Sequence, residues 1–363
     1  MYLKTLQIRD FRNLKPKSYE FSENVNVLLG KNAQGKTNIL EAIYLLSGHR
    51  SFRGSLDKEM IGFESSGYYI AGEFDGEEDK TLKLSVLETA GSLKKKVVCD
   101  GKEYKSARAL LSQVPMTVFS PDDLVLLKQG PSHRRDFCDV LLSTLFPSYS
   151  KTLSRYNRIV SQKNALLKDE ASSDELEIWN EQLSLFGASV LKGRTELLKR
   201  LTPTAQKCFF DMAGEKESIE FSYSCSFCDD LEKEEAQIAE DLLSKIRQNA
   251  FKEEAAGSCL YGPHRDDIEI KINGKDARVY ASQGQQRSAV LALLLAKTEL
   301  IKNQTGKTPI VLLDDVMSEL DDVRRSYLFG KIQGFQVFIT CCQDELTAKY
   351  DKKLFNVENG ELI

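Results

Sequence analysis

The sequence GKNAQGKT at residues 30–37 constrains the fold of this 363-residue chain more than any other feature. It matches the phosphate-binding pattern G-x-x-x-x-G-K-S/T. The apolar run at residues 25–29 precedes it and predicts a buried strand, and residues 37–46 follow with their apolar side chains on one face, which predicts a helix. A strand, a glycine-containing loop and a helix in this order predict a nucleoside triphosphate site in an α/β domain.

Each residue type in this loop has a chemical reason to be there. Gly30 and Gly35 let the backbone wrap phosphate groups with its N–H donors, at the positive end of the following helix. Lys36 is expected to reach the β- and γ-phosphates, and the Thr37 hydroxyl is expected to bind Mg²⁺. The loop therefore predicts ATP and Mg²⁺ as ligands. Its expected nucleotide-contacting residues are Gly30, Lys31, Asn32, Ala33, Gln34, Gly35, Lys36, Thr37 and Asn38.

A second part of the predicted site lies far along the chain. The apolar run at residues 310–313 predicts a buried strand, and Asp314 and Asp315 follow it directly. A carboxylate at the end of a strand in a parallel sheet can hold the water shell of Mg²⁺, and we assign this role to Asp314. Asp315 is the candidate general base for an attacking water, so Lys36, Asp314 and Asp315 form the expected catalytic set.

Residues 282–285 (SQGQ) come just before a helix predicted to begin near Ser288. Exposed N–H groups and the helix dipole make such a position an anion site. Because the phosphate loop already supplies one anion site, we interpret this one as a cap for the γ-phosphate held by a partner protomer. An ordinary helix N-cap would show the same local pattern. Its order and spacing relative to Asp314 favour the functional interpretation.

The composition limits the possible partners. The net charge of −4 and pI of about 5.7 do not indicate nucleic-acid binding by the chain as a whole, so any such surface must be a local basic patch. The N-terminus lacks the pattern of a signal peptide, and the apolar run at residues 290–296 is far too short to span a bilayer. We therefore expect a cytoplasmic protein without membrane contact. The eight cysteines are scattered and favour reduced thiols over a zinc site.

The periodicity of the chain predicts an α/β fold in three parts. Residues 1–130 are strand-rich and form the first part of an ATPase head, and residues 256–363 return to α/β character and complete it. Residues 131–255 have a helical period and are predicted to form an inserted domain. Within it we expect two antiparallel helices that form a short coiled-coil-like arm, although an ordinary helical subdomain fits the pattern equally well. A further acidic helix is predicted from Leu231 to about Phe251.

Several motifs together resemble a known family. The order of the phosphate loop, the SQGQ signature, the aspartate pair and SELD at residues 318–321 is similar to that of ABC/SMC-type ATPase heads. More specifically, the chain resembles the bacterial RecF family, and the similarity spans essentially its whole length. The segments that carry it are FRNL at 11–14, TNILEAI at 37–43, FSPDDL at 119–124, PSHRR at 131–135, GPHRDD at 262–267 and SQGQQR at 282–287.

The resemblance implies an ATP-dependent homodimer that binds double-stranded DNA, single-stranded DNA and gap junctions. It also implies partnership with RecO and RecR in loading RecA, with roles in recombinational repair, replication-fork maintenance and the SOS response. By position, Arg12 and Asn13 would line the nucleotide, and Ser282, Gly284 and Gln285 would close over the partner's γ-phosphate. Residues 318–321 would cross the dimer interface.

Two positions depart from the general ABC pattern. Asp315 stands where most of these ATPases have Glu, and Thr340 stands where many have a switch His. A shorter base and the lack of an imidazole predict slow hydrolysis that acts as a switch, and the resemblance to a DNA-binding family implies that DNA stimulates it. Turnover is then expected to be below the ~10 s⁻¹ that is typical of enzymes.

Other basic residues are candidates for the DNA surface. They are Lys94, Lys95 and Lys96 at a predicted hairpin, His133, Arg134 and Arg135 at a predicted helix start, and Lys151, Arg155 and Arg158 on a predicted helix. Each alone is more often a solvated face. His264 and Arg265 could be an interface brace or a nucleotide sensor, and we favour the structural role. The alternative functions are a nucleotide-binding subunit of a transporter, an SMC-like chromosome-organising protein and a nuclease.

Overall fold

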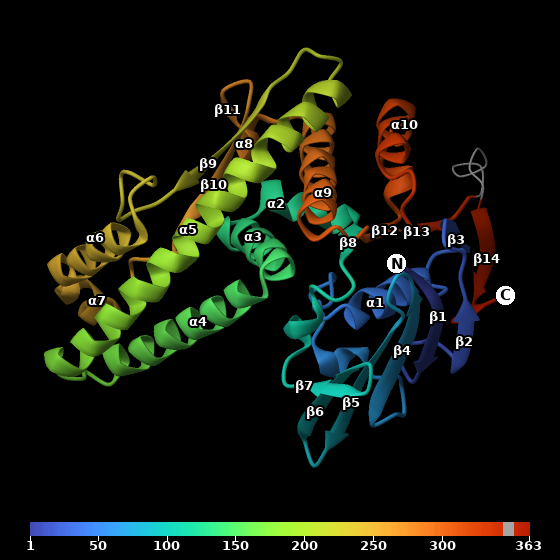
Figure 1. Ribbon diagram of the computed structural model, residues 1–363, viewed down its shortest axis with the longest axis horizontal. Helices are drawn as coiled ribbons and strands as arrows, with labels where there is room; N and C mark the ends of the chain where they lie inside the picture. Colours follow the sequence, from blue (N-terminus) through green and yellow to red (C-terminus); the bar gives the residue numbers. More distant parts are fainter. Residues whose placement is uncertain (344–351) are drawn as a thin grey trace. The chain divides into compact units, whose positions relative to one another are not determined.

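The computed structural model describes residues 1–343 and 352–363, which form two compact units (Figure 1). The first comprises residues 1–123 and 293–363, and we call it the discontinuous unit. The second comprises residues 124–292, and we call it the inserted unit. No helix in the described ranges combines the length and the apolar character that crossing a membrane requires.

One sheet of the discontinuous unit carries the phosphate-binding motif. Its strand order is β15-β14-β3-β13-β12-β8. The strands from β14 to β8 pair in parallel, and β15 forms an antiparallel hairpin with β14. Figure 1 shows the consequence, since β3 from the start of the chain lies beside β14 from its end. The bounds are β3 Val25–Leu29, β8 Met116–Phe119, β12 Ile310–Asp314, β13 Val337–Cys341, β14 Lys352–Glu358 and β15 Glu361–Leu362.

The second sheet of this unit is antiparallel throughout, in the order β2-β1-β4-β5-β6-β7. Alternating apolar residues along β4 and β5 place one face against the core and leave the other polar. Strands β4, β5 and β6 each pair with the next strand along the chain, as expected of successive hairpins. The bounds are β1 Tyr2–Arg9, β2 Lys17–Glu20, β4 Gly67–Asp75, β5 Lys80–Thr89, β6 Ser92–Cys99 and β7 Lys102–Tyr104.

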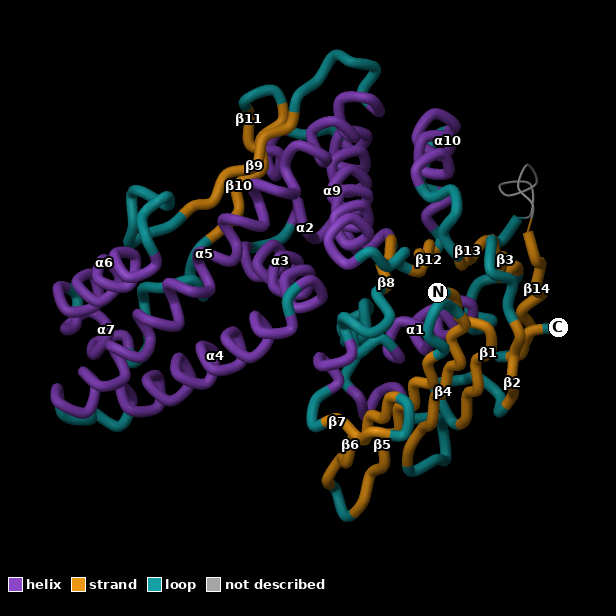
Figure 2. Tube along the Cα trace, in the orientation of Figure 1, coloured by secondary structure: helices purple, strands orange, loops and turns teal. Residues whose placement is uncertain are grey.

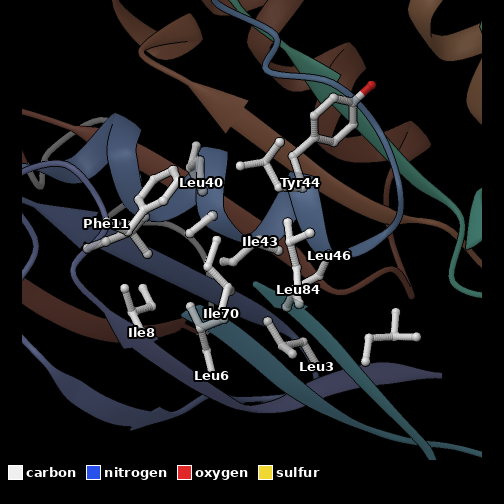
Figure 3. Close-up of a cluster of buried hydrophobic side chains, with 14 of the residues drawn as sticks. Leu3, Leu6, Ile8, Phe11, Leu40, Ile43, Tyr44, Leu46, Ile70 and Leu84 are labelled. Atoms are coloured by element: carbon white, nitrogen blue, oxygen red, sulfur yellow. The ribbon is translucent and has the colours of Figure 1, made fainter. Parts of the chain in front are cut away.

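Helix α1 (Lys36–Leu46) packs between the two sheets, in contact with β4 and β5 of one and with β12 and β13 of the other. It is buried on nearly every side, which explains its apolar sequence NILEAIYLL. Figure 3 shows Leu40, Ile43 and Leu46 of α1 over side chains of the antiparallel sheet. The phosphate-binding loop is therefore anchored at both ends in the core. The other short elements of this unit are η1 Asp57–Met60, η2 Ala107–Leu110, η4 Val316–Ser318 and α10 Asp322–Lys331, with η3 Pro121–Leu124 at the boundary.

The inserted unit is built mainly from helices, with one small sheet (Figure 2). The long helices α4 and α5 pack side by side after a short turn at residues 169–172. Ser172 begins α5 as its N-cap, accepting a hydrogen bond from the N–H of Glu175. The helix bounds are α2 Val125–Lys128, α3 Pro131–Leu145, α4 Pro147–Lys168, α5 Ser173–Met212, α6 Glu235–Gln248, α7 Ala250–Ala256 and α8 Ala277–Tyr280, and α9 Gln283–Thr305 continues into the discontinuous unit.

The face of α4 that packs against neighbouring helices contains a charged residue, Lys163, at a position where the spacing of apolar residues predicts a hydrophobic one. Lys163 is 1% exposed and donates a 2.5 Å hydrogen bond to Oε2 of Glu253 on α7. The other Glu253 oxygen accepts the backbone N–H of Leu260 at 2.7 Å. Burial of Lys163 is tolerated because its charge is paired and the partner carboxylate is itself hydrogen-bonded.

The helical period of residues 131–255 does not reveal strand β9 (Ile219–Ser224), which pairs with β10 (Asp267–Ile272). This antiparallel pairing joins segments that are distant in sequence, so local periodicity does not predict it. The pairing joins residues 267–272 to the inserted unit, which extends to residue 292, whereas residues 256–292 were expected in the C-terminal part of the head. Asn273 and Gly274 both have positive φ and form the turn from which β11 (Lys275–Asp276) returns along β10.

Two predicted helix bounds are wrong. The acidic helix begins at Glu235 and is followed by α7, because Asn249 leaves the helical conformation between them. Helix α9 begins at Gln283 and not near Ser288, so the SQGQ signature includes its first turn.

Candidate functional site

The phosphate-binding loop connects the end of β3 to the start of α1. Gly35 has φ of 109°, a left-handed conformation that favours glycine, and it is the N-cap of α1. Gly30 is required for a different reason. A Cβ atom there would lie 2.5 Å from the carbonyl oxygen of Val357 on β14. The two glycines therefore allow a sharp turn at one end of the loop and a close approach to the neighbouring strand at the other.

Lys36 is buried at the base of this loop, with 7% of its surface exposed. Its Nζ donates hydrogen bonds to the carbonyl oxygens of Gly30 at 2.5 Å and Lys31 at 2.9 Å, and lies 3.5 Å from Sγ of Cys342. The ammonium group is thus held within the curve of the loop. A fixed positive charge there is suited to phosphate oxygens.

Asp314 connects the two distant halves of the predicted site. The hydroxyl of Thr37 donates to its Oδ1 at 2.8 Å, and the hydroxyl of Thr340 on β13 donates to the same oxygen at 2.8 Å. Burial raises the pKa of Asp314, and the two hydroxyl donors act in the opposite direction. The carboxylate and the Thr37 oxygen are hard oxygen ligands placed side by side, so they fit the magnesium role predicted for them.

Thr340 also fixes Asp315, because its hydroxyl oxygen accepts the backbone N–H of Asp315 at 2.8 Å. Asp315 has a left-handed backbone with φ of 51° and begins η4 with its side chain exposed. The residue at the predicted switch position therefore links the two aspartates in the structure. Thr340 stands out in the sequence because it occupies the position of a switch His, and its hydrogen bonds with both aspartates follow only from the structure.

A cavity of about 480 Å³ opens beside the loop, a size suited to a small ligand. Arg12 lies on its wall, with its guanidinium paired with Glu41 at 2.5 Å and bonded to Ser55 at 2.7 Å. The side chains of Asn13 and Asn38 are joined by a 2.7 Å hydrogen bond. Residues 32–38, Asp315 and Thr340 complete most of the lining, so the cavity contains most of the residues predicted for the nucleotide.

Four further lining residues were missed by the sequence analysis: Arg53, Glu59, Ile61 and Phe63. They follow α1 in an irregular segment with no motif of its own. The signal that was available is an isolated aromatic residue between glycine and charged residues at 62–64, and it is too common to be diagnostic.

The signature residues lie in the inserted unit. Ser282 and Gln285 form a reciprocal cap, in which the Ser282 hydroxyl accepts the Gln285 N–H at 3.2 Å and the Gln285 side chain accepts the Ser282 N–H at 2.8 Å. The Gln285 amide also donates to Glu217 at 2.7 Å. The N-cap interpretation that was left open is thus confirmed. The Ser282 hydroxyl acts in it as an acceptor, so its own proton is not used by the cap.

Several of the basic residues considered for DNA have partners within the protein. Arg134 forms a bidentate pair with Asp267, and Arg135 donates to the carbonyl oxygen of Asp266 at 2.7 Å. Lys95 pairs with Asp57, and Lys96 pairs with Glu103. Lys151, Arg155 and Arg158 on α4 are exposed, and the guanidinium of Arg155 lies over the ring of Phe186, 4.4 Å from its centroid.

The pair His264 and Arg265 braces the turn before β10. Both side chains donate to the carbonyl oxygen of Cys259, the imidazole at 3.3 Å and the guanidinium at 2.8 Å. Burial lowers the pKa of His264 to about 4, so the ring is neutral and its Nδ1 accepts the Tyr156 hydroxyl at 2.6 Å. These contacts favour the structural role over that of a nucleotide sensor. None of the eight cysteines is joined in a disulfide, and no group of three or more His, Cys, Asp or Glu residues in the described ranges could hold a metal ion.

Comparisons with known proteins agree with this geometry. The model of the RecF/RecN/SMC N terminal domain family matches residues 2–361. The chain is 38% identical to the DNA replication and repair protein RecF of Clostridium tetani over 371 residues, which covers 100% of both chains. It is 39% identical to RecF of Caldanaerobacter subterraneus subsp. tengcongensis over 345 residues, covering 94% of each.

Among solved structures, the recombination mediator protein RecF with ATP in the RecFOR pathway matches with a TM-score of 0.91 and 38% identity. The match covers 100% of this chain and 97% of that one. An Smc head domain of Pyrococcus furiosus matches with a TM-score of 0.57 and 14% identity, a likeness that shows the fold alone. Because the family model and the RecF relatives match over nearly the whole chain, the chain belongs to the RecF proteins of the RecF/RecN/SMC ATPase family.

Proposed function

We propose that this protein is an ATP-gated, DNA-binding homodimer that acts in recombinational repair and at replication forks. The observation that carries the proposal is the junction of Thr37, Asp314 and Thr340, where hydroxyl groups and a carboxylate from both halves of the chain meet beside the phosphate-binding loop. ATP bound in the cavity would have its phosphates held by the loop N–H groups and Lys36. Thr37 and Asp314 would hold Mg²⁺.

Hydrolysis in this proposal is slow. Asp315 is the base that orients the attacking water, and its carboxylate is one methylene shorter than the Glu of most ABC ATPases. The left-handed backbone of Asp315 and the bond from its N–H to Thr340 fix its main chain beside the cavity. A rigid backbone with a short side chain favours slow hydrolysis, and the rate of hydrolysis then sets how long ATP keeps the dimer closed.

The dimer is proposed to close when Ser282, Gly284 and Gln285 of one protomer contact the γ-phosphate bound by the other. The free proton of the Ser282 hydroxyl and the positive end of α9 both suit an anion. A shift from mostly open to mostly closed dimers requires about 5.5 kcal/mol of differential binding. Phosphate contacts made only in the closed state are a physical source for part of it.

Mixing two inactive variants tests this arrangement. Lys36→Ala removes the loop lysine and Ser282→Ala removes the signature hydroxyl, so we expect each alone to lose ATP-dependent dimerisation and most ATP hydrolysis. In a mixed dimer, one composite site combines an intact loop with an intact signature. We therefore expect the mixture to recover up to about a quarter of wild-type hydrolysis, because half the dimers are mixed and each has one intact site of two.

If the mixture stays as inactive as its components while wild-type protein hydrolyses ATP, the site is completed within one chain and the shared arrangement is wrong. Lys83→Ala, which removes an exposed charge on β5, is the control for purification and net charge. It should behave as wild type alone and in mixtures.

The DNA-binding role and the protein partners are also proposals. They rest on membership of the RecF family and on the solved relative that is described as a recombination mediator in the RecFOR pathway. We propose that the protein works in the cytoplasm with RecO and RecR to load RecA at gaps between single-stranded and double-stranded DNA. The exposed residues Lys151, Arg155 and Arg158 on α4 are the proposed phosphate contacts.

The salt dependence of DNA binding tests this patch. Each phosphate contact contributes about 0.9 to the slope of log K against log salt. We expect the triple variant Lys151→Ala, Arg155→Ala, Arg158→Ala to bind a gapped duplex more weakly at low salt and to lower that slope by about 3 units. Lys207→Ala, an exposed lysine on α5, is the matched control. If the triple variant kept wild-type affinity and slope, these three residues would not contact the DNA, and the proposed surface on α4 would be wrong.

A further inference from the structure

The cavity beside the phosphate loop has a polar part and an apolar part. Lys36, Thr37 and the backbone of the loop account for a triphosphate and its metal ion. Ile61 and Phe63, which also line the cavity, have no role in binding phosphate. Phe63 is the one aromatic side chain among the described residues that line it.

The exposure of Phe63 has no explanation in packing. It is 92% exposed, the highest value among the exposed large hydrophobic side chains of the described residues. Ligand pockets are lined mainly by hydrophobic and aromatic side chains, and Phe63 is an exposed aromatic residue in the lining of this cavity. The neighbouring Ile61 is half-buried and forms a bridge with Phe11 at the end of β1.

The backbone that carries Phe63 is fixed although its ring is exposed. The Gly62 N–H donates to the Asp10 carbonyl oxygen at 2.7 Å, and the Arg12 N–H donates to the Met60 carbonyl oxygen at 2.9 Å. A turn closed by the Ser65 N–H and the Gly62 carbonyl oxygen at 3.1 Å then presents Phe63. A Cβ at Gly62 would lie 2.9 Å from the Asp10 carbonyl oxygen, so this close contact requires glycine. The ring is therefore held on a rigid turn attached to the segment that contains Arg12.

We propose that Phe63 is the base-stacking residue of the nucleotide site, with Ile61 as the apolar surface beneath the base. This inference rests on the proposed ATP site and adds to it the part that recognises the nucleobase. A nucleobase joined through ribose to a triphosphate in the loop needs an apolar, planar partner, and Phe63 supplies the aromatic face. An aromatic side chain loses little conformational entropy on stacking, because it has two rotatable side-chain bonds and its backbone is already fixed.

Base stacking can be recognised by its ligand dependence, because every nucleobase has a π face. The contribution of Phe63 should therefore be similar for ATP and GTP and should vanish for inorganic tripolyphosphate, which has no base. A residue that stabilised the loop or the metal would affect all three ligands alike.

The test measures binding of these three ligands with Mg²⁺ to the full chain. For Phe63→Ala we expect ATP and GTP to bind about tenfold more weakly and tripolyphosphate to bind as it does to wild type. Leu56→Ala is the matched control, since Leu56 is also exposed, at 69%, and is not among the cavity-lining residues. Lys36→Ala should weaken all three ligands, so a failure of the ATP site itself is distinguishable from a failure of the stacking proposal.

A second variant gives a spectroscopic measurement. Phe63→Trp in a Trp179→Phe background places the single tryptophan of the chain at the site. We expect near wild-type ATP affinity and quenching of its fluorescence by ATP and GTP, with no quenching by tripolyphosphate. The proposal is overturned if Phe63→Ala keeps wild-type affinity for ATP, or if it weakens tripolyphosphate equally. A loss of dimerisation with unchanged nucleotide affinity would likewise overturn it, by placing Phe63 in the protomer interface.

Discussion

Replacing Lys36 by alanine is expected to weaken Mg-ATP binding by about 10- to 150-fold, which corresponds to the 1.5–3 kcal/mol of a hydrogen bond to a charged group. The reason is that Nζ lies within the curve of the loop, 2.5 Å from the Gly30 carbonyl oxygen and 2.9 Å from that of Lys31. Removal of this charge leaves the phosphates with backbone N–H donors alone. Titration calorimetry with a slowly hydrolysed ATP analogue measures the change directly.

The fold should survive this substitution, because the two carbonyl groups remain near the solvent-accessible cavity and water can replace the ammonium group. Lys83→Ala removes the same charge from the exposed face of β5 and should leave the affinity unchanged. If Lys36→Ala bound ATP as wild type does, or if Lys83→Ala lost it equally, the loop would not be the nucleotide site.

A large loss of stability is expected in the inserted unit when Arg194 is replaced by methionine. The guanidinium of Arg194 is 3% exposed and forms two 2.9 Å hydrogen bonds to the carboxylate of Asp139. It also donates to the Pro263 carbonyl oxygen at 2.6 Å, which ties α5 to the turn before β10. Removal of one partner of a buried pair leaves an uncompensated charge, so the inserted unit should lose about 3–5 kcal/mol of stability.

Tryptophan fluorescence can follow this unit by itself, because the single tryptophan, Trp179, lies on α5. The midpoint of urea unfolding measured by tryptophan fluorescence should therefore lie at a lower urea concentration in Arg194→Met than in wild type. Arg158→Met, an exposed arginine on α4, should change stability by no more than about 0.5 kcal/mol. If the urea midpoint measured by fluorescence were the same in Arg194→Met and wild type, the buried charge of Asp139 would be stabilised without Arg194, and the prediction would be wrong.

Much of the site was predictable because its signals are local. The glycines, Lys36 and Thr37 are read from a contiguous motif, and Asp314 is read from an apolar strand that ends in a carboxylate. Flanking apolar runs predicted β3, α1 and β12 because a buried parallel strand and a core helix both need continuous apolar sequence. The family resemblance then indicated which distant segments belong together.

The parts of the fold and of the site that the sequence did not predict depend on contacts between segments that are distant in sequence. β9 is stabilised by pairing with β10, and no periodicity within residues 219–224 indicates that partner. Lys163 occupies a core position because Glu253 is placed opposite it by α7. Thr340 bridges Asp314 and Asp315 because β13 lies next to β12 in the sheet. Phe63 reaches the cavity because its turn is hydrogen-bonded to the end of β1. Such roles follow from tertiary placement, which local sequence does not encode.

The most direct test of the central claim is analytical ultracentrifugation of the full chain with and without Mg-ATP, in the presence of a gapped DNA duplex. The proposed arrangement predicts that ATP converts wild-type protein to a dimer that sediments with the DNA. It also predicts that Lys36→Ala and Ser282→Ala remain monomeric and bind the DNA weakly. An oligomeric state that does not depend on ATP, together with wild-type behaviour of Ser282→Ala, would contradict it, because the signature would then act as a helix cap and nothing more.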